Sequence, residues 1–243
     1  MAEGKSLEQR WQHTALGLGA AYFGVADLSA AQEQIWEQGG EMLAQYPIAL
    51  SVGVVMPFAI VDQLPHHQDE AVALAYSTQS YDILNDRLDQ IASRLASVVQ
   101  RAGYTAFPIR ASQTANAEKL QGLFSHKLAA HQAGLGWIGK SCLLITPEVG
   151  PRVRWTSVLT DAPLTSGHPV DQRCGDCREC VNACPVGAFT GRNFRPSEPR
   201  EAQYDAFKCH TYLRRHERTP DLDRSVCGMC VYVCPHGRDG VPG

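Results

Sequence analysis

The stretch Cys174-Gly-Asp-Cys177-Arg-Glu-Cys180-Val-Asn-Ala-Cys184-Pro185 decides how this chain is organised. Its spacing is C-x2-C-x2-C-x3-C-P, and a tight loop of this kind can turn its first three sulfurs inward around one iron–sulfur cluster. The fourth cysteine lies on the following turn and points away, so it is expected to serve a different cluster. The motif therefore predicts a second set of cysteines elsewhere in the chain.

That second set lies downstream, in Cys227-Gly-Met-Cys230-Val-Tyr-Val-Cys234-Pro235, with Cys209 upstream as a separate ligand. Because the last cysteine of each run crosses to the other cluster in two-cluster ferredoxins, two sets of four are expected. Cluster one takes Cys174, Cys177, Cys180 and Cys234, and cluster two takes Cys184, Cys209, Cys227 and Cys230. The alternatives are disulfides or a zinc ribbon, but a ribbon needs two CxxC pairs and four ligands, not eight cysteines.

Composition limits the class of protein further. The 243 residues are 44% hydrophobic and 19% charged, which is typical of a globular chain. No run approaches the ~18 apolar residues of a membrane span, and thiolates that hold iron need a reducing compartment, so we expect a cytoplasmic protein without a membrane partner. Residues 1–150 contain 9 Lys and Arg against 14 Asp and Glu, and residues 151–243 contain 13 against 11. This balance is not that of a strong nucleic-acid binder.

The segments before the cysteines alternate between helical and strand patterns. A helix should begin at Ser6 with Gln9 as its capping-box partner, and a long amphipathic helix should span about 80–102, with Leu84, Leu88, Ile91, Leu95 and Val98 on one face and Gly103 at its end. A second long helix is expected at about 117–133. Residues 35–45 are read as helix or loop, and Pro65–His67 as a loop. Strands are expected at 22–26, 48–56, 106–111, 143–146 and 155–160, and a domain boundary at 162–169.

The stretch Gly134-Leu-Gly-Trp-Ile-Gly139-Lys140-Ser141 satisfies the phosphate-loop pattern G-x4-G-K-S by letter. A phosphate loop follows a strand and opens a helix, whereas here a helix precedes and a strand follows. We therefore expect no ATP binding. Two interpretations remain: a helix C-cap at Gly134 with a tight turn into a strand, or a glycine-lined wall that lets a large planar cofactor approach the backbone.

Taken together, Ser125-His126-Lys127, the stretch 133–140, Leu143-Leu-Ile145, Thr160-Asp161-Ala-Pro-Leu164 and the two cysteine sets resemble epoxyqueuosine reductases and their short relatives. The resemblance implies a cobalamin-dependent iron–sulfur reductase with two 4Fe–4S clusters. It also implies an α/β (α+β) fold: residues 1–168 as a nitroreductase-like, cobalamin-processing-type domain and residues 169–243 as a ferredoxin-like domain. It assigns cobalamin to Ser125, His126, Gly134, Gly136, Trp137, Gly139 and Lys140.

Two features differ from the tRNA reductases of that family. Those enzymes place an aspartate acid before the glycine loop, whereas Ile109–Leu120 contains no aspartate, so Glu118 and His126 are the nearest candidates for a catalytic acid. For both of these a structural role, as a solvated helix residue or a satisfied core histidine, is the alternative. Those enzymes also continue into a helical-repeat module that contacts tRNA, whereas this sequence stops at Gly243. We therefore do not expect tRNA as a partner.

The sequence thus predicts a reductase that takes electrons from a low-potential donor of the ferredoxin or flavodoxin type. The alternative is an electron-transfer protein or reductive activator that serves a separate corrinoid protein. Cys142, the ninth cysteine, is read as a buried small hydrophobe. His210 and His236 lie beside cluster cysteines and are read either as tuning residues or as surface histidines, and the basic run Arg214, Arg215 and Arg218 as a docking patch or a solvated face.

Overall fold

The computed structural model describes residues 6–215 and 226–238, and these form two compact units. The first unit takes residues 6–55, 85–135 and 154–170, and the second takes 56–84, 136–153 and the described residues from 171 onward. The last change of unit, after Val170, lies close to the expected boundary at residue 168. The second unit, however, also draws two segments from earlier in the chain, so a division into 1–168 and 169–243 stays a prediction.

The first unit is built on a four-stranded sheet with the order β1-β2-β6-β3. Its strands are β1 (Tyr22–Asp27), β2 (Ile48–Val55), β6 (Val153–Thr160) and β3 (Ala106–Ile109). β1 pairs antiparallel with β2 and β3 antiparallel with β6. The interior of β2 is buried at every position, as its alternation of apolar and small residues predicts for a strand covered on both faces. The mixed α/β class is therefore confirmed.

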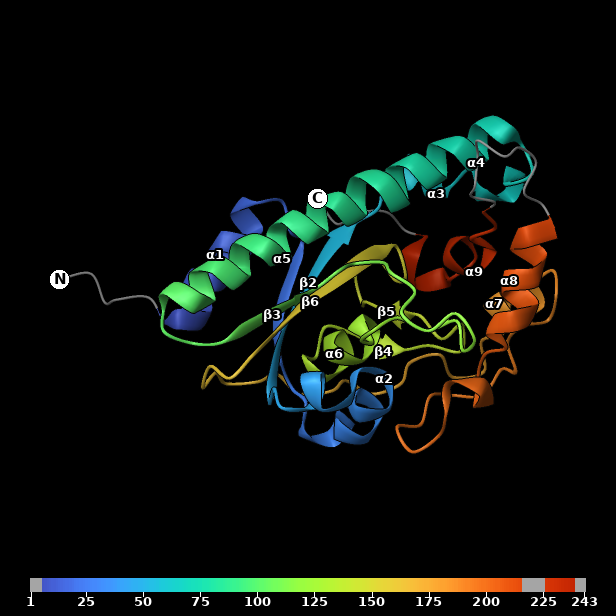
Figure 1. Ribbon diagram of the computed structural model, residues 1–243. Coiled ribbons are helices and arrows are strands. Elements are labelled where there is room, and N and C mark those ends of the chain that lie inside the picture. The colour runs from blue at the N-terminus through green and yellow to red at the C-terminus, as the bar shows by residue number, and fades with distance from the viewer. Residues whose placement is uncertain (1–5, 216–225, 239–243) are drawn as a thin grey trace. The chain divides into compact units, whose positions relative to one another are not determined.

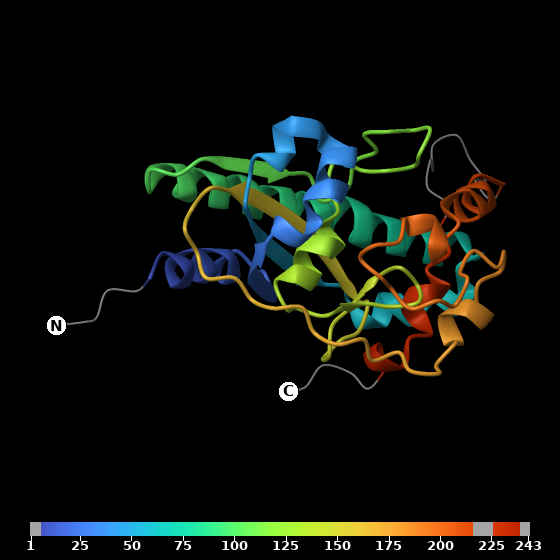
Figure 2. The same cartoon turned by 90° about the horizontal axis from the view of Figure 1, so that it is seen from below.

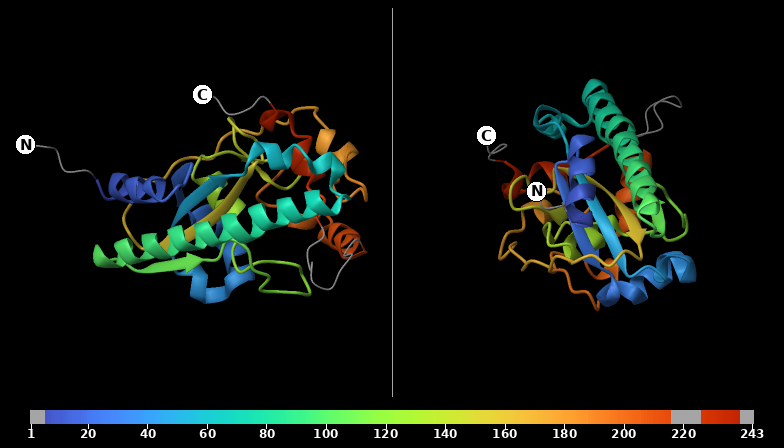
Figure 3. Two further views of the ribbon diagram at one scale, coloured as in Figure 1. Left: turned by 90° about the horizontal axis from the view of Figure 1, so that it is seen from above. Right: turned by 90° about the vertical axis from the view of Figure 1, so that its left-hand side faces the viewer.

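Helices cover both faces of this sheet. Helix α5 (Leu84–Arg101) lies along one face and α6 (His126–Gln132) along the other, where α6 contacts β1 and β2 (Figures 1, 2 and 3). Helix α1 (Leu7–Gly17) has the expected capping box, with Ser6 and Gln9 each bonded to the other's backbone. Trp11 of α1 packs edge-on against Tyr104, just beyond α5. Between the first two strands lie η1 (Ser29–Ala31) and α2 (Gln32–Ala44), with a break at Gly40.

Two helix predictions need correction. The helix expected at 80–102 begins as α5 at Leu84, since residues 78–83 form a π-helix, η3 (Thr78–Ile83). Its core face uses Val99, which is fully buried, where the sequence pattern favoured Val98. The helix expected at 117–133 is only α6, because Asn116 and Gln121 pair across a tight turn and the backbone of Leu120 has a positive φ of 48°.

The second unit contains short elements. Two-residue strands β4 (Trp137–Ile138) and β5 (Leu144–Ile145) pair antiparallel. Pro65 and His66 belong to a 3₁₀ helix and not to an open loop, because His67 N–H bonds back to the Leu64 carbonyl. Besides η3, the helical elements are α3 (Phe58–Val61), η2 (Leu64–His66), α4 (Glu70–Ser77), α7 (Glu179–Asn182), η4 (Arg200–Ala202), α8 (Ala206–Arg215), α9 (Met229–Tyr232) and η5 (Pro235–Gly237). Among the described helices, none is both long and apolar enough to cross a lipid bilayer.

Candidate functional site

The first cysteine motif folds as a tight turn followed by one helical turn. Cys177 N–H bonds to the Cys174 carbonyl at 2.9 Å, and Gly175 between them adopts a φ of 48°, which glycine tolerates without strain. Cys180 lies on the short helix α7, and Cys184 follows that helix. The local sequence thus produces the compact loop that its spacing predicts.

Four cysteines from the two motifs line one small cavity in the second unit. They are Cys174, Cys177 and Cys180 from the first motif and Cys234 from the second. Gly139, Lys140, Ser141 and Ile145, from the β4–β5 hairpin, line the same cavity. Cys184, the fourth cysteine of the first motif, is not among the lining residues. This is the arrangement that a crossed fourth ligand requires.

The other four cysteines form a second group. Burial raises the pKa of the Cys227 thiol, and negative charge on Cys209 and Cys184 would raise it further. Burial likewise raises the pKa of Cys230, and negative charge on Cys227, Cys209, Cys180 and Cys184 would raise it further. Helix α7, which precedes Cys184, contacts helix α9, which carries Cys230, so the two motifs lie side by side in the second unit. We call Cys174, Cys177, Cys180 and Cys234 group one, and Cys184, Cys209, Cys227 and Cys230 group two.

The chemistry of these donors fits iron–sulfur clusters. Burial raises the pKa of Cys234 to about 12 and that of Cys180 to about 11, so neither would ionise at neutral pH unless a bound cation stabilised the thiolate. Within the described residues, no three metal-binding side chains converge closely enough for a single ion. Sulfurs that surround a cavity, without meeting at one point, suit a multi-iron cluster better than a mononuclear zinc ion.

Hydrogen bonds reach the sulfurs of group two from outside. Ala188 N–H donates to Cys184 Sγ at 3.2 Å. Burial raises the pKa of Cys209, and a hydrogen bond donated by the Tyr204 hydroxyl opposes that increase. Hydrogen bonds to cluster sulfurs are one of the means by which a protein sets a cluster's reduction potential. The sequence analysis missed Tyr204, since a lone tyrosine between the motifs carries no signal.

Two glutamines, which the sequence analysis also missed, tie the β4–β5 hairpin to other segments of the second unit, and one of them reaches group one. Gln172 donates to the Ile138 carbonyl at 2.9 Å and accepts from Cys174 N–H at 2.9 Å. Gln203 is buried and donates to the carbonyls of Gly139 and Arg192. Both side chains satisfy backbone groups that lie far apart in the sequence, so only the folded chain reveals their role.

The glycines of the stretch 134–141 pack against other atoms of the chain. Gly134 ends α6 in a Schellman motif, with a φ of 76°. Its N–H donates to the His131 carbonyl, and the N–H of Leu135 donates to the Ala130 carbonyl. A Cβ on Gly136 would lie 2.2 Å from the Ile145 carbonyl oxygen, and one on Gly139 would lie 2.8 Å from the Ile145 side chain and 3.4 Å from Cys174 Sγ. These contacts support the C-cap and tight turn over a wall for a planar cofactor.

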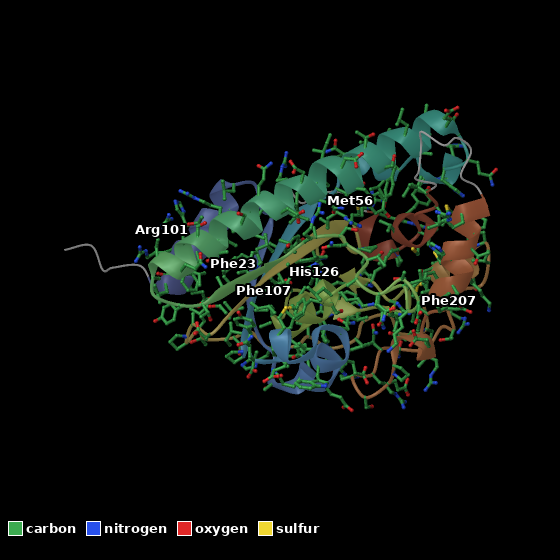
Figure 4. The ribbon with its side chains drawn as sticks, viewed as in Figure 1. Phe23, Met56, Arg101, Phe107, His126 and Phe207 are labelled. Carbon is green, nitrogen blue, oxygen red and sulfur yellow. The ribbon has the colours of Figure 1, made fainter. Side chains whose placement is uncertain are left out.

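The residues proposed for acid catalysis lie in the first unit. His126 is partly buried at the start of α6 (Figure 4), where Nδ1 lies 3.0 Å from Ser157 Oγ and Nε2 lies 2.8 Å from the Arg110 carbonyl oxygen. Because a carbonyl only accepts, Nε2 carries the proton and Nδ1 accepts from Ser157. Burial lowers the pKa of His126 to about 4. This is the geometry of the satisfied histidine, while Glu118 lies exposed on the turn 116–121.

The other residues singled out in the sequence are explained by helix capping position, ring packing and burial. Ser125 occupies the N-cap position of α6 but makes no capping hydrogen bond. Trp137 is 1% exposed and packs edge-on against His236, with ring centres 4.8 Å apart. Cys142 is buried, as expected, at a positive φ of 57°. Of the basic run, Arg218 lies outside the described residues.

Comparison with known proteins agrees with the cysteine geometry. Residues 173–237 match the family model of a 4Fe-4S double cluster binding domain. The chain is 32% identical over 114 residues to an epoxyqueuosine reductase from Bacillus anthracis, a match that covers 46% of this chain and 28% of that protein. It is 28% identical over 255 residues to one from Pseudomonas aeruginosa, which covers 96% of this chain and 62% of that protein. The chain thus matches less than two thirds of these relatives' lengths.

Solved structures show the same fold. A reductive dehalogenase described with B12-dependent dehalogenation covers 99% of this chain and 34% of its own length, with a TM-score of 0.71 at 22% identity. The epoxyqueuosine reductase from Streptococcus thermophilus covers 98% of this chain and 68% of its own, with a TM-score of 0.63 at 17% identity. The mixed α/β fold with a C-terminal double-cluster region is shared with both. The chain is therefore similar to epoxyqueuosine reductases, and its residues 173–237 match a 4Fe-4S double cluster binding domain.

Proposed function

We propose that this chain is an iron–sulfur reductase that holds two 4Fe–4S clusters and uses a bound cobalamin. The observation that carries the proposal is the cavity lined by Cys174, Cys177, Cys180 and Cys234, which brings together cysteines from two motifs. When bound, the clusters supply one-electron transfer, and cobalamin supplies a strongly reducing cobalt centre. The electron donor in this proposal is a low-potential protein of the ferredoxin or flavodoxin type.

The chain's own part is to hold and shield the clusters. Group one would hold one cluster beneath the β4–β5 hairpin, whose Gly139 leaves room for Cys174 Sγ. Group two would hold the other, with Ala188 and Tyr204 donating hydrogen bonds to its sulfurs. These contacts limit water around the sulfurs and influence both potentials.

Cobalamin is supported by similarity and not by the residues that the resemblance assigned to it. Gly134, Gly136 and Gly139 face protein atoms, His126 has both ring nitrogens bonded, and Lys140 bonds to backbone carbonyls. Since these residues are already engaged, they do not fit an open cobalamin site, and no chemical step is assigned to them. The same observation favours a second candidate function, an electron-transfer protein or reductive activator that serves a separate corrinoid protein.

Anaerobic reconstitution separates the two functions. The purified chain, supplied with iron and sulfide, should take up about eight irons if both groups of four cysteines hold 4Fe–4S clusters. Cobalamin is then added and its absorption spectrum is recorded after desalting. Retained cobalamin in a base-off form supports the reductase, and two clusters without retained cobalamin support the electron carrier. A chain that takes up zinc but no iron would contradict both.

We further propose that tRNA is not the substrate. Opening an epoxide reductively requires protonation of the leaving oxygen, and a positioned acid contributes roughly 10²–10⁴ in rate. No aspartate lies in 109–120, Glu118 is exposed on a turn, and His126 is neutral above about pH 4 because burial lowers its pKa. Incubating the reduced protein with epoxyqueuosine tRNA should yield no queuosine by nucleoside mass spectrometry. Multiple turnovers to queuosine would overturn this proposal.

A further inference from the structure

Lys140 is a buried cation beside group one. Only 7% of the surface of Lys140 is exposed to solvent. Among the described residues, no carboxylate forms an ion pair with it. Its Nζ instead donates to the Gly175 carbonyl at 2.6 Å and to the Cys177 carbonyl at 3.1 Å. Lys140 also lines the cavity that the four cysteines of group one surround.

A buried ammonium is costly unless negative charge and hydrogen bonds compensate for the lost hydration. The two carbonyls satisfy part of its hydrogen-bonding capacity but carry no net charge. A cluster held by four thiolates is an anion, and reduction adds a further negative charge to it. Glu179 also lines the cavity beside Lys140, but it is exposed to solvent, and among the described residues it forms no ion pair with Lys140. The sulfurs of group one line the same cavity, so a cluster bound there would supply the buried counter-charge for Lys140.

The two carbonyls also belong to the turn that carries cluster ligands. Gly175 lies between Cys174 and Cys177, and the turn is closed by the hydrogen bond from Cys177 N–H to the Cys174 carbonyl. One ammonium, on the loop between β4 and β5, therefore bonds to two points of the four-residue turn 174–177. This restrains the turn from outside, in the same way that Gln172 restrains its first residue.

We propose that Lys140 is a positioning residue for the group-one cluster, which clamps the Cys174–Cys177 turn and makes the cluster easier to reduce. This inference rests on the proposed function, since it needs a cluster at group one. Two physical effects follow from its position. The ammonium offsets the charge gained on reduction, in a buried site where solvent screens it weakly, and so raises the potential. The restrained turn keeps the sulfurs in place and so favours retention of the cluster. The letter pattern of a phosphate loop thus has a different use here.

The test compares four proteins after anaerobic reconstitution: wild type, Lys140→Met, Lys140→Arg and Lys208→Met. Lys208→Met is the matched control, because it removes the same charge next to a cluster cysteine but from an exposed position paired with Asp205. Iron content, circular dichroism and EPR-monitored redox titration are measured on each. A Cys209→Ala protein identifies which EPR signal belongs to group one.

We expect Lys140→Met to shift the group-one potential to more negative values, by clearly more than any shift in Lys208→Met, and Lys140→Arg to restore most of it. Selective loss of group-one iron in Lys140→Met, with group two and circular dichroism intact, also supports the proposal. If Lys140→Met does not fold, Lys140→Gln takes its place, since its amide can still donate to a carbonyl without charge. An unchanged group-one potential and iron content overturns the inference, whereas failure of the wild type to hold clusters overturns the proposed function.

Discussion

The two units of this molecule are built by different means. The first has a four-stranded sheet, the 18-residue helix α5 and a core of fully buried Leu and Ile side chains. The second has paired strands of two residues, and its described α-helices range from four residues in α7 and α9 to ten in α8. Isolated helices of that length are unstable in water, so the second unit depends on contacts other than regular secondary structure. We infer that its clusters are part of its fold, whereas the first unit is held by apolar packing.

The largest difference between the two units is expected when iron is removed, because only the second unit should lose stability. Metal binding at a structural site is folding free energy, worth ~10 kcal/mol in small zinc domains, so chelation should cost the second unit several kcal/mol. Hydrogen exchange of the reconstituted and iron-free proteins, followed by peptide, would measure it. We expect residues 174–209 to lose protection and residues 84–101 to keep it. Equal protection in both states would show that the second unit folds without its clusters.

Single cysteine substitutions sharpen the comparison within the second unit. Cys234→Ala should damage the cluster held mainly by the first motif, because Cys234 lines the cavity of group one, and Cys209→Ala should damage the other. Each variant should keep about half of the iron, with different EPR signals remaining. If both variants lose the same cluster, the crossed wiring is wrong.

A smaller effect is expected in the first unit, from His126. Burial lowers its pKa from 6.5 to about 4, so between these values the unfolded chain binds the proton more readily than the folded one. The stability due to neutral His126 is therefore complete above pH 6.5 and declines as the pH falls towards 4. Because the side chain is only partly buried, we expect a contribution on the order of 1 kcal/mol.

Urea unfolding of His126→Gln between pH 7.5 and 5 would measure this effect. The variant should lose less stability across that range than wild type, although its stability at pH 7.5 should be lower by ~1 kcal/mol, because the hydrogen bonds to Ser157 and Arg110 are altered. His13→Gln, on the exposed side of α1, is the matched control. An identical pH dependence in wild type and His126→Gln would contradict the prediction.

The last prediction is that the protein shows no specific binding of ATP. The G-x4-G-K-S stretch follows helix α6, contains strand β4 and leads into strand β5, and Lys140 Nζ is bonded to two carbonyls. Calorimetric titration of the reconstituted protein with ATP and Mg²⁺ should therefore give no specific heat. A micromolar affinity that Lys140→Ala abolishes would restore the phosphate-loop interpretation and an ATP-driven activator.

The sequence by itself determined the features that depend on local spacing. The C-x2-C-x2-C spacing predicted a tight turn, which the bond from Cys177 N–H to the Cys174 carbonyl confirms. For Gly134 the sequence left a helix C-cap and a cofactor wall open, and the positive φ of Gly134 supports the C-cap. The capping box was predicted from the three-residue spacing between Ser6 and Gln9, and the buried strand β2 from its alternation of apolar and small residues. Periodicity alone failed at 117–125, where the turn closed by Asn116 and Gln121 takes precedence over helical spacing.

Only the tertiary structure decided what the polar side chains do. Lys140, Gln172 and Gln203 bond to backbone carbonyls that lie between 11 and 64 residues away in the chain. His126 bonds to the Ser157 hydroxyl and the Arg110 carbonyl. A lysine or histidine in a motif is equally compatible with a ligand contact or a backbone contact. The choice follows from which unpaired groups the fold brings near it, since a buried donor or acceptor must find a partner.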